Sequence, residues 1–206
     1  MAHMLTDIEV RVLGALIEKE ITTPDYYPLS LNSLITACNQ SSNRNPVTHY
    51  DEGAVAEAAE TLREKGYVHR VDRGQSRVDK YRHVVYEALN LGRPAIAVMG
   101  VLMLRGPQTL GEIRSRSSNL YNFTSLDEIQ TVLESLMNGE NPLVVRLPRQ
   151  PGQKEVRFGH LLSGEIVAGE HEVEAEPNPE PDRIGKLEKE VEDLKKQFEQ
   201  FRKQFE

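Results

Sequence analysis

Residues 51–82, DEGAVAEAAETLREKGYVHRVDRGQSRVDKYR, predict an α-helix followed by a two-stranded hairpin. Asp51 is a helix N-cap residue, and apolar residues then recur at helical spacing until Gly66, which suits the position just past a helix end. Alternating apolar and polar residues over 67–71 predict the first strand. Asp72-Arg73-Gly74-Gln75 predicts a turn, after which the chain returns as the second strand.

Two further helices precede this segment. Thr6-Asp7-Ile8-Glu9 has the spacing of a capping box and predicts a helix that ends near Lys19. Residues 29–38 predict a second, shorter helix, and the polar residues 39–46 predict a loop. Three helices followed by a hairpin is the order of a winged helix, a relative of the helix-turn-helix motif.

The same order recurs downstream. Residues 98–102, VMGVL, match residues 12–16, VLGAL, and Ser125 opens another expected capping box. The other expected elements are a short helix at 109–115 and strands at 143–147 and 156–161 around a wing at 148–154. The pattern predicts a mainly α, α+β protein with two tandem winged-helix domains, at residues 5–83 and 84–163.

The chain changes character after these domains. Residues 164–182 are acidic and contain three prolines, which predicts a disordered linker. Residues 183–206 carry apolar residues at alternating spacings of three and four, which is typical of a coiled coil and predicts a homodimer. An amphipathic helix that folds back on its own domains is the alternative. The expected dimer contacts are Ile184, Leu187, Val191, Leu194, Phe198 and Phe201.

Net charge bears on the class of partner. The 206 residues carry a formal charge of −7, which at first argues against nucleic-acid binding. Residues 164–206, however, contain 13 acidic and 7 basic side chains and so carry six of the seven negative charges. The remaining chain is nearly neutral. The charge therefore restricts which surfaces contact nucleic acid and does not exclude such contact.

The first domain contains a distinctive series of short segments, which are Glu9-Val10-Arg11-Val12-Leu13-Gly14, Ile17-Glu18-Lys19, Thr22-Thr23-Pro24, Tyr27-Pro28-Leu29-Ser30-Leu31-Asn32, Ala37-Cys38-Asn39-Gln40, Asn43-Arg44 and Pro46-Val47. In these segments the chain resembles the YceH-like bacterial proteins of unknown function. The resemblance continues more loosely to about residue 163. It implies tandem winged helices and oligomerisation, and it supplies no activity or substrate.

No assembled catalytic or metal site is expected. The histidines are scattered without metal-ligand spacing, and Cys38, the single cysteine, lies on the apolar stripe of its helix. Neither a Gly-rich phosphate loop nor a Gly-x-Ser-x-Gly elbow occurs. We therefore expect a non-enzymatic protein without a cofactor. The absence of a leader and of a long apolar run favours a cytoplasmic protein with no membrane contact.

Cations gather on the expected wings and at the turns before each third helix, where they suit phosphate contact. These candidates are Arg44, Arg70, Arg73, Arg77, Lys80, Arg114, Arg116, Arg149 and Lys154. They favour a dimeric protein of transcription-regulator type that binds double-stranded DNA. Carboxylates on both third helices oppose this hypothesis. Two alternatives stay open: arginines paired with neighbouring acids on an ordinary surface, and a protein-interaction scaffold built on tandem winged helices.

Overall fold

Helices dominate the fold, and small sheets complete it. The structure is a computed structural model that describes residues 4–71, 79–149 and 153–166. The first half contains α1 (Asp7–Thr22), the short 3-10 helix η1 (Pro24–Tyr26), β1 (Leu29–Ser30), α2 (Leu31–Cys38), α3 (Glu52–Glu64), β2 (Val68–Val71) and β3 (Lys80–His83). The second half contains α4 (Val85–Ala88), α5 (Arg93–Arg105), α6 (Leu110–Arg116), α7 (Leu126–Met137), β4 (Val144–Arg146) and β5 (Phe158–His160). A helix-rich α+β fold is confirmed.

Local capping chemistry fixes where the long helices begin. Thr6 and Glu9 form the expected capping box at α1, and Asp51 caps α3 by accepting the amide of Ala54. Ser125 caps α7, but the expected box is wrong in one respect. Glu128 accepts hydrogen bonds from the amide and hydroxyl of Thr124, each at 2.9 Å, so its carboxylate binds the residue before the N-cap, whereas a capping box would have it accept the amide of Ser125.

The first half contains a three-stranded antiparallel sheet in the order β1-β3-β2. Strands β2 and β3 pair with each other, as the sequence predicted, and are called the first hairpin below. The expected second helix begins too early, because Leu29–Ser30 pair with β3 in the register Leu29↔Tyr81. Ser30 then caps α2 through the amide of Ser33. The extended backbone at Ser30 therefore ends the strand and begins the helix.

The second half repeats this arrangement on a smaller scale. Strands β4 and β5 pair through Val145↔Gly159 and Arg146↔Phe158. These strands and the described residues next to them, 147–149 and 153–157, are called the second hairpin below. Gln108 forms an isolated bridge to Phe158 on the free edge of β5. This bridge corresponds to β1 in the first half. Helix α4 was not expected from the sequence.

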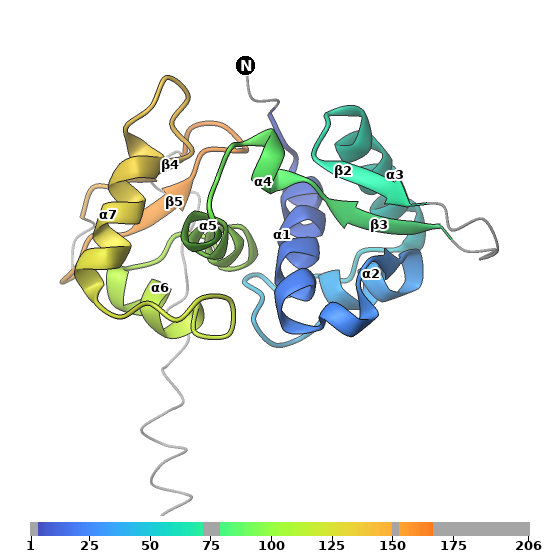
Figure 1. Ribbon diagram of the computed structural model, residues 1–206, viewed down its shortest axis with the longest axis horizontal. Coiled ribbons are helices and arrows are strands. Elements are labelled where there is room, and N and C mark those ends of the chain that lie inside the picture. Colours follow the sequence, from blue (N-terminus) through green and yellow to red (C-terminus); the bar gives the residue numbers. More distant parts are fainter. Residues whose placement is uncertain (1–3, 72–78, 150–152, 167–206) are drawn as a thin grey trace, which may run out of the picture. The chain divides into compact units, whose positions relative to one another are not determined.

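Two buried helices, α1 and α5, lie at the centre of the fold. Every residue of α1 from Glu9 to Glu18, and every residue of α5 from Ala95 to Leu104, is buried. Both helices lie together in Figure 1, with α2 and α3 beside α1 and with α6 and α7 beside α5. A Cβ atom at Gly14 would lie 3.0 Å from Leu104, so this glycine allows the two helices to approach closely.

Several expectations concern residues outside the described ranges. These are most of the acidic linker at 164–182, the coiled coil at 183–206, and with it the dimer contacts. The described residues from 4 to 166 belong to a unit that extends to Ala168. Within these residues, no helix has the length and apolar character needed to cross a membrane.

Candidate nucleic-acid interface

The structure places Arg44 in the interior, although the sequence analysis had placed it among the phosphate contacts. Its side chain has no exposed surface and forms a two-pronged ion pair with Glu18, with Nη1–Oε1 at 3.1 Å and Nη2–Oε2 at 2.6 Å. Arg44 also donates two hydrogen bonds to the carbonyl oxygen of Ala37. A phosphate has no access to this guanidinium, because the protein already surrounds it.

A second buried arginine, Arg11, supports the same end of α2. Its guanidinium donates to the carbonyl oxygens of Cys38 at 3.1 Å and Pro46 at 2.6 Å. Cations at a helix carboxyl end stabilise the last carbonyl groups. Burial raises the pKa of the adjacent Cys38 thiol to about 12, although Arg44 and Arg11 oppose this shift. Cys38 is therefore a protonated core residue, as its position on the apolar stripe predicted.

The loop between α2 and α3 is held by the protein itself. Asn39 exchanges two hydrogen bonds of 2.8 Å with the backbone of Tyr50. The amide of Asn45 donates to the carbonyl oxygen of Leu104 at 2.9 Å, and Arg105 donates to the side chain of Asn43. The amide side chains of this loop therefore tie it to the backbone and to the carboxyl end of α5.

The first hairpin offers fewer available cations than the sequence suggested. Arg70 lies 3.5 Å from Asp79, and both side chains are about half exposed. This pairing is the ordinary-surface alternative that the sequence left open. Lys80 is half-buried on β3, while Arg73 and Arg77 lie outside the described residues.

The turn between α6 and α7 contains one paired and one exposed arginine. Arg116 lies 3.8 Å from Glu112 and also donates to the side chain of Gln108. Arg114 is exposed, and within the described part of the chain it donates one long hydrogen bond, 3.5 Å, to the carbonyl oxygen of Thr124. Arg114 is therefore the cation of this turn that faces solvent.

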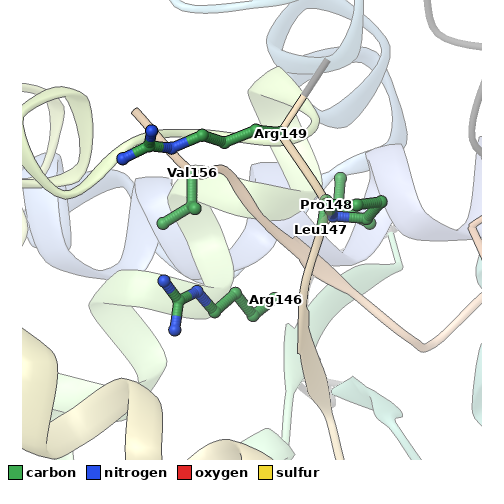
Figure 2. Close-up of a pocket in the computed structure, with 5 residues that line it drawn as sticks. All are labelled: Arg146, Leu147, Pro148, Arg149 and Val156. Carbon is green, nitrogen blue, oxygen red and sulfur yellow. The ribbon is translucent and has the colours of Figure 1, made fainter. Parts of the chain in front are cut away.

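The second hairpin carries the clearest cationic site. Arg146, at the end of β4, and Arg149 line an open groove of about 510 Å³ together with Leu147, Pro148 and Val156. Figure 2 shows both guanidinium groups extending in the same direction on either side of Val156. Neither arginine forms an ion pair with any residue in the described ranges.

One groove residue, Arg146, was missed by the sequence analysis. The sequence predicts a strand at this position, which gives the residue no contact role. The signal that could have identified it is its position two residues before Pro148, where a strand leaves the sheet and its side chains become exposed. Lys154 was expected as a wing cation and is exposed on the same hairpin.

Carboxylates cover the exposed faces of the two third helices. Glu57 and Glu64 on α3 are exposed, and Glu60 between them pairs with Arg63. On α7, Asp127 and Glu134 are exposed. They are seven residues apart and therefore lie on the same face of the helix. Both faces would therefore repel a phosphate backbone.

The described part of the chain contains no group of three or more His, Cys, Asp or Glu side chains arranged to hold a metal ion. The buried Cys38 thiol stays protonated, because burial raises its pKa to about 12. Among the described residues, cations on an open groove are the feature that most resembles a binding site.

Comparisons with known proteins place the chain in a family. Residues 5–153 match the family model described as "Protein of unknown function, DUF480". A UPF0502 protein of Pelobacter propionicus is 51% identical over 203 residues, which cover 95% of this chain and 92% of the relative. A UPF0502 protein of Geobacter sulfurreducens is 48% identical over 202 residues, covering 94% and 91%.

A third relative, a UPF0502 protein of Opitutus terrae, is 46% identical over 196 residues, which cover 93% of this chain and 84% of the relative. Neither the family description nor these names state an enzymatic activity. The resemblance to an uncharacterised bacterial family is thereby confirmed, and the chain belongs to the DUF480 (UPF0502) family of bacterial proteins of unknown function.

Proposed function

We propose that this protein is a non-enzymatic DNA-binding protein built from two tandem winged helices, with domains at residues 5–83 and 84–163. The element order supports this interpretation. In the first half α1, β1, α2 and α3 precede the first hairpin, and in the second half α5, the Gln108 bridge, α6 and α7 precede the second. In a winged helix of this order, the hairpin is the wing, which contacts the nucleic acid.

The observation that carries the proposal is the arginine pair on the second hairpin. Arg146 and Arg149 extend together from an open groove and lack an ion-pair partner among the described residues (Figure 2). Two neighbouring unpaired guanidinium groups raise the local potential and match the charge of adjacent phosphates. Arg114 and Lys154 add exposed cations to the same half.

The binding surface belongs mainly to the second half. In the first half Arg44 is buried, Arg70 is paired with Asp79, and the loop before α3 is attached to α5. Dimerisation through residues 183–206 would present two copies of the second hairpin to one duplex. Two linked weak contacts bind more tightly than either contact alone.

The test compares two double variants with the same change in net charge. We expect R146Q/R149Q to weaken duplex binding at low salt by about tenfold, since two phosphate contacts are lost. The control R63Q/R93Q replaces exposed arginines on other elements and should bind within about twofold of the parent. Fluorescence anisotropy with a labelled duplex measures both. Equal weakening by the two variants would contradict the assignment to the second hairpin.

A scaffold for protein partners is the second candidate function. The carboxylates on the exposed faces of α3 and α7 favour it, because they suit a basic protein surface better than phosphate. The folded chain would then fail to bind any duplex at low salt. A stoichiometric protein partner should also copurify after nuclease treatment.

A further inference from the structure

The distribution of charge over the second half indicates how DNA would be held. The elements that approach a duplex in a winged helix are the third helix and the wing. Here α7 exposes Asp127 and Glu134, whereas the second hairpin exposes Arg146 and Arg149. The two elements therefore carry opposite charges and cannot contact the phosphates equally well.

The first half does not compensate for this difference. Helix α3 carries Glu57, Glu60 and Glu64 at spacings of three and four, so a carboxylate occurs at each turn of one face. Arg63 forms an ion pair with Glu60, which leaves the helix face with an excess of carboxylates. In the major groove a carboxylate can accept a hydrogen bond from cytosine, but it lacks the two-pronged contacts that arginine and asparagine make to purines.

The cationic groove has the chemistry of a backbone contact. Its guanidinium groups flank the apolar side chain of Val156, and Leu147 and Pro148 complete the lining. In a DNA strand, two phosphates flank the apolar face of a deoxyribose. This order of charged, apolar and charged groups matches the order of the two guanidinium groups and Val156 in the groove. Among the described residues that line this groove, none has an amide side chain that could select a base edge. Phosphate contacts set position on the duplex and carry no sequence information.

We infer that this protein holds duplex DNA by its sugar–phosphate backbone, through the second hairpin, and binds it without regard to sequence. The inference rests on the proposed function. It changes the expectation of a transcription regulator that the sequence gives, because the ligand would be duplex DNA of any sequence and not a defined operator. The carboxylates of α3 and α7 would keep these helices out of the major groove.

The inference is tested by measuring how affinity varies with sequence. The full-length protein is titrated at one salt concentration with labelled duplexes of equal length: A·T-rich, G·C-rich, mixed, and one enriched from a random pool. We expect dissociation constants that agree within about threefold, as for binding dominated by backbone charge. A duplex bound more than about tenfold more tightly than the others would overturn the inference, since specific readers discriminate far more strongly.

A second variant examines the role of α7 directly. D127N/E134Q removes two exposed carboxylates without creating a cation. We expect it to bind every duplex about threefold more tightly, because repulsion of phosphate falls equally for all sequences. A change in the ratio between duplexes would overturn the inference, since it would mean that α7 contacts bases. Absence of binding to every duplex would overturn the proposed function as well, whereas selective binding would overturn only the inference.

Discussion

At the scale of single residues, the same side-chain type serves opposite roles in the two halves. Arg44 is fully enclosed and paired with Glu18, whereas Arg146 projects from an open groove. Sequence reasoning placed Arg44 among the binding residues because it precedes a helix, where cations often contact phosphate. It could not foresee the ion pair, because Glu18 lies 26 residues earlier in the chain and meets Arg44 only in the folded state.

Arg44→Ala should strongly destabilise the fold. The substitution leaves the Glu18 carboxylate with only the more distant Lys19, 3.5 Å away, and removes the Arg44 donors from the carbonyl oxygen of Ala37. We expect the free energy of unfolding to fall by about 3 kcal/mol, as when one partner of a buried pair is removed. Urea denaturation measures the effect. Arg63→Ala breaks an exposed ion pair and should leave the urea midpoint close to that of the parent. An equal loss of stability in both variants would contradict this role for Arg44.

Cys38 should be chemically inert in the folded protein. Its thiol is fully buried, and burial raises its pKa to about 12, so the reactive thiolate is scarce at pH values below the ordinary thiol pKa. We expect alkylation of the native protein to be at least about 100-fold slower than alkylation in urea, because it requires unfolding. Mass spectrometry of timed samples follows the reaction. Similar rates in the two conditions would mean that the site opens without unfolding.

At the scale of elements, α1 and α5 depend on close contact at two glycines. Gly14 lies against Leu104 and Met103, and a Cβ atom at Gly100 would lie 3.2 Å from Ile17. The sequence had aligned these glycines as repeated positions. What it could not show is that they face the partner helix, since a repeat indicates similar units and not how the units pack. The close contact between α1 and α5 therefore depends on packing between residues that are distant in the sequence.

Gly14→Ala and Gly53→Ala should have opposite effects. An added methyl group at Gly14 meets Leu104 and Met103, and overpacking of this kind costs about 1 to 3 kcal/mol. At Gly53, an exposed residue in the first turn of α3, the methyl group meets only the Asp51 side chain at 3.4 Å, and alanine favours the helix by up to about 1 kcal/mol. Thermal denaturation of both variants measures the difference. Equal stability would contradict a tight contact between α1 and α5.

At the scale of the whole molecule, local sequence patterns predicted the helices better than the contacts between them. Capping residues and periodicity placed α1, α3, α6 and α7 to within a few residues, and alternation placed both hairpins. These signals are local. Strand β1, the interior position of Arg44 and the exposed arginine pair depend on partners distant in the sequence, so the candidate site was only partly identified.

The heptad repeat predicts a homodimer that depends on residues 183–206. We expect light scattering to give twice the 23.3 kDa mass of one chain. Placing charges in the apolar seam, as in L187K/L194K, should yield a folded monomer with weaker DNA binding, because avidity is lost. Circular dichroism checks that the variant remains folded. A variant that stays dimeric would mean that the dimer contact lies elsewhere.

The most direct test of DNA binding is its dependence on salt. Affinity for a duplex is measured across a series of salt concentrations, and its logarithm is plotted against the logarithm of concentration. Four exposed cations of the second half, Arg114, Arg146, Arg149 and Lys154, would give a slope of about −3 to −4 for each bound chain. We expect R146Q/R149Q to reduce this slope by about two. A duplex that does not bind at the lowest salt concentration, or a slope near zero, would contradict the proposed function.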